Sequence, residues 1–269
     1  MIPVLLNTGF VTIYTYGLFV VLALFWFLYL AWKSIRITKH KEEEIFDRIL
    51  GSIFIGLVAG RIAYMLFHID LIVKKGIIVV AAIHLYPGIH GTTVIVVASL
   101  VMIILMTRGK KYSGLEIITY LTPAIFVAMA ILSIGSVFAG TDVGIVTQFP
   151  IRMKFALYDG LRHIPGLYEA IIFLIASLVF NRLILSVRQG KINYGLVVAL
   201  FFWVISFVHI GTSQLRDIIT YQKLASYRSF DLYFAIITLL TSLILVMYYV
   251  RSYLFGMFEF LIGRHKNHG

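Results

Sequence analysis

Long apolar runs separated by short polar segments make up most of this chain. The runs at residues 11–32 and 232–250 are each close to the roughly 20 residues that a helix needs to cross a hydrocarbon core. Neither run alternates apolar and polar positions with a period of two, which is the pattern of a transmembrane β-strand. The pattern therefore predicts an all-α, polytopic membrane protein.

About seven segments have the length and apolar character of a membrane span. Between the second and third of them, residues 76–89 are apolar but half as long, and Tyr86-Pro87-Gly88 interrupts them. This stretch is too short to cross the bilayer and too apolar for a free loop, so we predict a re-entrant or interfacial segment. The predicted spans are residues 11–32, 50–67, 91–107, 115–138, 167–186, 192–212 and 232–252.

The polar segments predict the remaining organisation. Residues 40–48 mix acidic and basic side chains and predict a short surface helix that leads into the second span. Residues 141–165 and 214–231 are the longest polar stretches, and with the half-length segment they predict a small cap on the outer face. The sequence has no internal repeat or low-complexity tract, so residues 1–269 are predicted to form a single transmembrane domain.

Composition narrows the class further. Apolar residues make up 61% of the chain and charged residues 13%, whereas soluble domains have about 25% charged residues. The chain has no cysteine, so neither disulfides nor thiol catalysis is expected, and no metal or other cofactor is predicted. The net charge of +11 is typical of loops beside anionic headgroups, so nucleic acid is not an expected partner.

The distribution of basic residues predicts the orientation in the membrane. One set of alternate loops, together with the C-terminal tail, carries 12 lysines and arginines, and the opposite set carries 8. Because basic residues collect in cytoplasmic loops, the N-terminus is predicted outside and the C-terminus in the cytoplasm.

A few ionisable residues fall within or beside the predicted spans. Such groups cost several kcal/mol at membrane depth unless they face protein or water, so each is a candidate functional residue. Most of them fall toward the outer half of the membrane under the predicted topology, which favours a polar cavity open to the outer leaflet. The set is Arg61, His68, His90, Glu116, Arg162, His163, Glu169 and His209.

Several of these residues also have a purely structural interpretation. Arg61 is long enough to snorkel to the headgroups, and His209 is more typical of a hydrogen-bonded core histidine. Glu116 and Glu169 both fall in the predicted first turn of a helix, where an acid complements the helix dipole. His90 differs because it lies among glycines in the stretch Pro-Gly-Ile-His-Gly, where backbone can approach a ligand closely, so a ligand-facing role is favoured.

Short motifs recur in the order found in a known family. They are Tyr16-Gly17, Gly60-Arg61, Tyr64-Met65-Leu66-Phe67, His90-Gly91, Ile134-Gly135 with Gly140 and Gly144, Arg162-His163, and Leu167-Tyr168-Glu169-Ala170. Over residues 10–210 the chain resembles the prolipoprotein diacylglyceryl transferases, bacterial inner-membrane enzymes with seven spans and the N-terminus outside. These enzymes move a diacylglyceryl group from phosphatidylglycerol to a cysteine thiol of a secreted prolipoprotein.

The resemblance implies roles for particular residues. His90 matches the histidine of the family's His-Gly-Gly motif, although Thr92 replaces the second glycine, and it would serve as the base. The other matching positions would contact a lipid headgroup that resembles phosphatidylglycerol. They are Tyr16, Arg61, Arg162, His163, Tyr168 and Glu169.

The central signature of the family is altered. Where the family has Gly-Arg-x-Gly-Asn and then Asn-Gly-Glu, this chain has Leu-Ser-Ile-Gly-Ser at 132–136 and Ala-Gly-Thr at 139–141. Ser133 thus replaces the arginine, and Ser206 falls at the position of a second family arginine. Serine cannot replace a bidentate, charged contact to phosphate.

Three hypotheses for function follow. The favoured one is a non-catalytic, lipid-binding or scaffolding subunit of a membrane complex, with other membrane or secreted proteins as candidate partners. The alternative is an active transferase in lipoprotein biogenesis that uses His90 with relocated arginines, for which Arg61, Arg162, Arg216 and Arg228 are available. A transporter or channel is less favoured because the sequence has no inverted repeat or matched broken helices.

Overall fold

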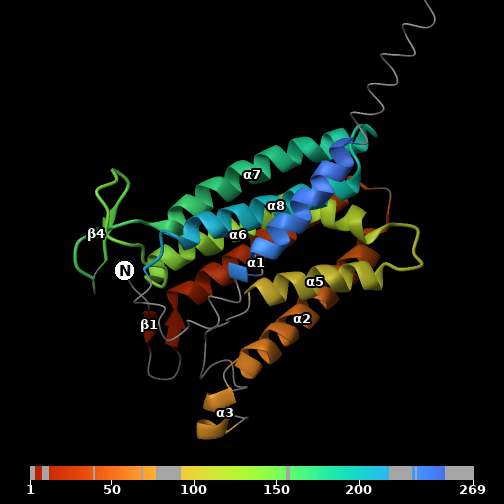
Figure 1. The fold of residues 1–269 in the computed structure, drawn as a ribbon. Coiled ribbons are helices and arrows are strands. Elements are labelled where there is room, and N and C mark those ends of the chain that lie inside the picture. Colours follow the sequence, from red (N-terminus) through yellow and green to blue (C-terminus); the bar gives the residue numbers. More distant parts are fainter. Residues whose placement is uncertain are drawn as a thin grey trace, which may run out of the picture. The chain divides into compact units, whose positions relative to one another are not determined.

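The structure is a computed structural model, and it describes residues 4–7, 12–38, 40–67, 69–76, 92–155, 158–217, 232–233 and 235–251. Most of this part is helical (Figure 1). Apart from residue 76, the predicted half-length segment lies outside the described residues. In chain order the elements are β1 (Val4–Asn7), β2 (Thr12–Tyr14), α1 (Thr15–Ile35), α2 (Glu42–Phe67), α3 (Ile69–Lys75), α5 (Thr92–Met106), α6 (Gly114–Ala139), β3 (Met153–Lys154), β4 (Leu161–Arg162), α7 (Pro165–Arg188), α8 (Tyr194–Ser213) and a last helix, Ala235–Arg251.

The helices confirm a polytopic membrane protein. Within the described residues, α1, α6, α7 and α8 are long and apolar enough to cross a membrane, and Ile95–Met106 and Ala235–Arg251 are shorter apolar helices. The structure differs from the predicted helix boundaries in two places. Residues 12–14 form a strand paired with β1 rather than the start of a span. The predicted surface helix is also not separate, because α2 runs without a break from Glu42 to Phe67.

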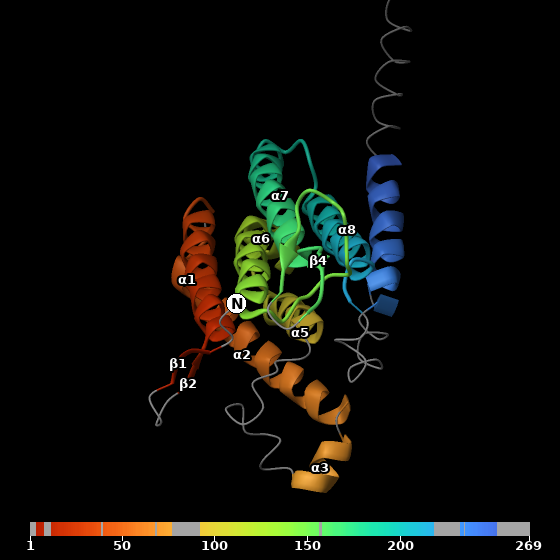
Figure 2. The ribbon, with the colours of Figure 1, turned by 90° about the vertical axis from the view of Figure 1, so that its left-hand side faces the viewer.

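The chain forms two compact units. The first contains Met1–Tyr29 and Thr122–Gly269, and in it α6, α7 and α8 lie side by side (Figures 1 and 2). The core of this unit forms around the fully buried Phe126 of α6. Its ring lies 4.9 Å from that of Phe180 in α7 and 5.2 Å from that of Phe201 in α8. Aromatic contacts of this kind join all three helices.

Short antiparallel segments cover one end of α6 and α7 in this unit. β3 pairs with β4, Val146 pairs with Arg162 of β4, and Gly144 pairs with Arg216. Ile145 donates its backbone N–H to the Leu215 carbonyl at 2.9 Å and accepts one from His163 at 3.0 Å. The segments after α6, before α7 and after α8 are therefore held together by backbone hydrogen bonds.

The second unit contains Leu30–Leu121, where α2 packs against α5. The two helices approach each other closely at Gly56. A Cβ atom there would lie 2.7 Å from the carbonyl oxygen of Ile95 and 2.1 Å from the hydroxyl of Ser99. Only glycine fits this contact, because small residues let the backbones of membrane helices approach closely.

Candidate functional site

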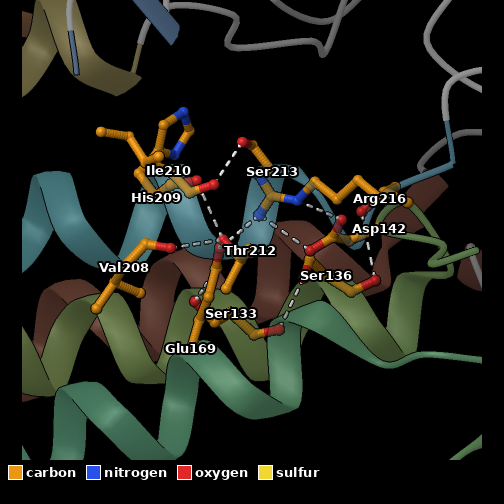
Figure 3. Close-up of polar contacts among 11 residues, drawn as sticks. Ser133, Ser136, Asp142, Glu169, Val208, His209, Ile210, Thr212, Ser213 and Arg216 are labelled. Carbon is orange, nitrogen blue, oxygen red and sulfur yellow. Dashed lines mark hydrogen bonds and ion pairs between the residues drawn. The ribbon is translucent and has the colours of Figure 1, made fainter. Parts of the chain in front are cut away.

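Glu169 is the centre of a polar cluster in the first unit (Figure 3). It is buried in α7 beyond the first turn, so the predicted dipole interaction is not what holds it there. Thr212 of α8 donates a hydrogen bond to its Oε1 at 2.6 Å, and Ser133 of α6 donates to its Oε2 at 3.1 Å. Arg216 donates through Nη2 to the same Oε1 at 2.6 Å. The carboxylate therefore connects α6, α7 and α8.

Arg216 also contacts a second carboxylate, that of Asp142. Its Nε lies 2.8 Å from Asp142 Oδ1, and Nη2 donates to Oδ2 at 3.2 Å. The Nε contact is an ion pair rather than an aligned hydrogen bond. The arginine side chain thus lies between Asp142 and Glu169, and both carboxylates form ion pairs with its guanidinium group.

A glycine turn places Asp142 in this position. Gly140 has a φ of +71°, and α6 ends there. The N–H of Gly140 bonds to the Val137 carbonyl at 3.2 Å, and that of Thr141 bonds to the Ser136 carbonyl at 3.1 Å. These two bonds form a Schellman motif, which favours glycine at its left-handed position. Gly140 is one of the glycines that this chain shares with the family signature, and its role here is to turn the backbone toward Arg216.

A second ion pair extends the cluster. Arg162 of β4 pairs with Asp217 through Nη1, and the same nitrogen donates to the Gly144 carbonyl at 3.1 Å. Its guanidinium lies 5.1 Å from the centre of the Tyr158 ring, within the range of a cation–π contact. Arg162 is therefore held by a carboxylate, a carbonyl and an aromatic ring.

His163 and Tyr168 form the edge of the cluster. Tyr168 donates its hydroxyl hydrogen to the Ile151 carbonyl at 2.7 Å, so its oxygen accepts from His163 Nδ1 at 3.1 Å. The two rings, with Phe149 and Leu215, line a shallow, open and apolar hollow. Apart from the histidine and tyrosine hydrogen bonds, this surface offers apolar contact only.

The charges of the cluster determine what it can bind. With all groups ionised, its two arginines and three carboxylates carry a net charge of −1. Tyr16, which is half-buried at the start of α1, interacts electrostatically with Asp142 and Glu169. A phosphate that entered here would meet an excess of negative charge, because each arginine already contacts a carboxylate.

The structure brings together five of the predicted site residues. Tyr16, Arg162, His163, Tyr168 and Glu169 all belong to the cluster or its edge. Arg61 lies in α2, in the second unit. His90 and His68 lie outside the described residues, as does Arg228. Glu116, which has a structural interpretation, is in the first turn of α6 and contacts His40 at 3.2 Å.

Sequence reasoning missed three members of the cluster, namely Asp142, Asp217 and Thr212. Aspartates in polar segments are usually solvated, and a threonine near a helix end is common, so neither type stands out alone. The Arg-Asp pair at 216–217 beside a predicted span was the available signal. It did not indicate the partners, because they are far apart in the sequence.

The two serines that the resemblance places at arginine positions of the family are both buried. Ser133 is 8% exposed and donates to Glu169, so the position now supplies a small neutral donor to the cluster. Ser206 is 2% exposed in α8. The Cβ of an alanine at Gly166 would lie 2.5 Å from the Ser133 carbonyl oxygen, so α7 begins in close contact with α6 here.

Comparison with known proteins gives a consistent match. The family model described as prolipoprotein diacylglyceryl transferase matches residues 3–248. A protein of Listeria monocytogenes serotype 4b (strain CLIP80459), named phosphatidylglycerol–prolipoprotein diacylglyceryl transferase, is 26% identical over 200 residues, which is 72% of this chain and 71% of that protein. A protein of the same name from Listeria welshimeri serovar 6b is 24% identical over 205 residues, with the same coverage of both chains.

Proposed function

This chain belongs to the prolipoprotein diacylglyceryl transferase family, and we propose that it is a non-catalytic member that binds phospholipid and serves as a scaffold in a membrane complex. The proposed ligand is a phosphatidylglycerol-like lipid, because that lipid is in the name of the Listeria relatives. A chain can share the fold of this family without its catalytic activity, because catalysis depends on particular side chains rather than on the fold.

The pairing of the arginines carries this proposal. An active enzyme without the two family arginines would need other cations to hold the departing phosphate. Arg162 and Arg216 are candidates for that role, but each contacts carboxylates of this chain. Releasing an arginine would leave a buried carboxylate unpaired, which costs several kcal/mol. A headgroup phosphate would have to offset that cost before it gained anything from the site.

The same proposal includes an arrangement in the membrane. We propose about seven spans in one transmembrane domain, with the N-terminus outside and the C-terminus in the cytoplasm of a bacterial inner membrane. The strands around residues 143–163 would then belong to the outer cap, together with the re-entrant half-length segment. The basic loops support this orientation, because positive charge collects on the cytoplasmic side.

One observation favours the alternative of an active transferase. His163 and Tyr168 occupy family motif positions, are joined by a hydrogen bond, and line an open apolar hollow. An acyl chain or a peptide could contact such a surface. In that alternative, His90 would act as the base, and Arg61 and Arg228 would supply the cations.

A direct transfer assay distinguishes the two functions. The purified full chain is reconstituted with phosphatidylglycerol and a lipobox peptide, and the thioether product is measured by mass spectrometry. The Listeria monocytogenes relative is the positive control, and the His90→Ala variant tests any product that forms. We expect no thioether product from this chain, while phosphatidylglycerol stays bound through purification.

The opposite result would be equally clear. Product that forms with this chain and disappears in the His90→Ala variant would establish an enzyme with a rearranged cationic site. Loss of bound lipid from a correctly folded protein, together with absence of product, would remove the lipid-binding half of the proposal.

A further inference from the structure

A short segment that ends in β3, residues 149–154, combines exposed apolar and exposed basic side chains. Phe149 is 49% exposed and Ile151 is 45% exposed. Arg152 and Lys154, which follow them, are exposed as well. What this mixed surface can contact depends on where the segment lies relative to α7.

Tyr168 holds the apolar part of this segment against the first turn of α7. Its hydroxyl donates to the Ile151 carbonyl at 2.7 Å, and its ring centre lies 6.4 Å from that of Phe149 in an edge-on contact. The loops beside β4 lie at this same end of α7 in Figure 1. The segment is therefore fixed to α7 through one hydrogen bond and one aromatic contact.

Tyr168 belongs to the face of α7 that points away from the protein core. Residues three, four and seven positions further along a helix lie on the same face. In α7 these are Ile171, Ile172 and Ile175, which are 46%, 39% and 56% exposed. The buried residues of α7, such as Phe173, lie on the opposite face. Because α7 is long and apolar enough to cross a membrane, its exposed apolar face is the one that contacts lipid.

The length of α7 indicates the depth of Tyr168 in the membrane. At about 1.5 Å of rise per residue, the helix from Tyr168 to Arg188 is about 30 Å long, which matches the thickness of a hydrocarbon core. Tyrosine is enriched at the boundary between hydrocarbon and headgroups. We therefore expect residues 149–154 at the level of the headgroups, on the lipid side of α7.

The backbone of the segment suits an environment with little water. Phe149 donates its backbone N–H to the Thr147 hydroxyl at 3.0 Å, and Pro150 has no N–H. The Ile151 carbonyl accepts from Tyr168. Backbone groups without a partner cost several kcal/mol in lipid, and the addition of a peptide strand to a sheet edge needs such groups to be free. These contacts favour a segment that meets its surroundings through side chains.

We propose that residues 149–154 form a membrane-interface anchor. Phe149 and Ile151 insert between the headgroups and the acyl chains, and Arg152 and Lys154 contact the phosphates of anionic phospholipids. Aromatic and aliphatic side chains beside basic ones are typical of segments that lie in this layer. The anchor extends the lipid-facing surface of α7, and it does not depend on whether the chain is a transferase.

A spin label at Ile151 measures the depth of the segment. The chain has no cysteine, so Ile151→Cys provides a single site for a nitroxide label. Tyr168 contacts the carbonyl of this residue, so the side chain can be replaced without loss of that hydrogen bond. The full chain is reconstituted in nanodiscs of phosphatidylcholine mixed equally with phosphatidylglycerol. Electron paramagnetic resonance then compares collisions of the label with oxygen, which concentrates in lipid, and with a water-soluble nickel chelate.

Ile175→Cys and Lys191→Cys are the matched controls. Ile175 lies on the lipid-facing face of α7, about 10 Å further along the helix than Tyr168. Lys191 is exposed in the loop after α7. We expect the ratio of oxygen to nickel collisions to be highest at Ile175, lowest at Lys191 and intermediate at Ile151. A thermal unfolding curve of each labelled variant checks folding.

The two basic residues are tested with the same label at Ile151. We expect the oxygen-to-nickel ratio to be higher in the mixed nanodiscs than in phosphatidylcholine alone, because anionic headgroups attract Arg152 and Lys154. The variant R152Q/K154Q should remove this difference. The control variant R188Q/K191Q, which changes the opposite end of α7, should leave it intact.

Three results would contradict the proposal. A collision ratio at Ile151 equal to that at Lys191 would place the segment in water and overturn the anchor. Low collision rates with both reagents would mean that protein covers the segment, which would favour contact with a second copy of the chain. A dependence on phosphatidylglycerol that persists in R152Q/K154Q would overturn the role of the two basic residues.

Discussion

Glu169 accepts side-chain contacts from α6, from α8 and from the segment after α8. Its two oxygens accept hydrogen bonds from Ser133, Thr212 and Arg216, and Arg216 also contacts Asp142. A carboxylate with three donors in a buried position is stable as an ion only while those donors stay in place. At the scale of single residues, the cluster therefore has a structural role, because it connects three helices.

Replacement of Glu169 by Gln tests this structural role. The glutamine keeps the shape but removes the charge that Arg216 and Thr212 contact, so the arginine is left with Asp142 alone. We expect the free energy of unfolding to fall by about 3 kcal/mol, as when one partner of a buried pair is removed. The measurement is a denaturation curve of the purified protein in detergent.

Glu44→Gln is the control for that variant. Glu44 pairs with Arg48 at 3.9 Å, and its side chain is 48% exposed. Exposed pairs contribute less than about 1 kcal/mol, so this variant should unfold almost like the unmodified chain. Equal curves for the two variants would mean that the Glu169 cluster adds no more stability than a surface pair.

At the scale of elements, glycines determine where helices end and how closely they pack. Gly140 ends α6 in a left-handed turn that places Asp142 beside Arg216. Gly144 lies so close to β4 that a Cβ there would be 2.5 Å from the His163 carbonyl oxygen. Both glycines match the family signature, and in this structure both have a packing or backbone role that needs no catalysis.

Gly56 and Gly17 make a matched pair for testing helix packing. An alanine at Gly56 in α2 would clash with the Ile95 carbonyl oxygen in α5, and side-chain rotation cannot relieve a contact with backbone. We expect Gly56→Ala to destabilise the protein by about 1–3 kcal/mol. Gly17→Ala in α1 meets nothing within 4 Å and should stabilise by up to about 1 kcal/mol. Thermal unfolding of both variants measures the difference, and destabilisation by Gly17→Ala as well would contradict this account of the α2–α5 contact.

At the scale of the whole molecule, the absence of cysteine makes the orientation directly measurable. Single cysteines can be introduced at Arg152, before β3, and at Lys191, between α7 and α8, both of which are exposed. With the N-terminus outside, a membrane-impermeant maleimide should label Arg152→Cys in intact cells. It should label Lys191→Cys only after the cells are opened.

The reverse labelling pattern would invert the proposed topology. Labelling of both positions in intact cells would instead indicate an even number of crossings between residues 152 and 191. Under the proposed orientation, the Glu169 cluster would be near the outer surface and the α5–α6 loop near the inner one.

The sequence alone determined that this is a membrane protein of helices, and it identified the family. Both results rest on local properties. A helix forms all its backbone hydrogen bonds internally in lipid, so about 20 apolar residues suffice to predict a span. Short motifs in a fixed order can be recognised without knowledge of any tertiary contact. The sequence also marked Glu169, Arg162 and Arg216 as residues that needed an explanation.

Only the tertiary structure decided what those charges do. Arg216 meets Glu169 across 47 positions of the chain, and Arg162 meets Asp217 across 55. Such pairs depend on how α6, α7, α8 and the strands around them pack, and no local pattern encodes that packing. The same holds for the close approach at Gly56, since burial and packing are properties of neighbours in space rather than of neighbours in sequence.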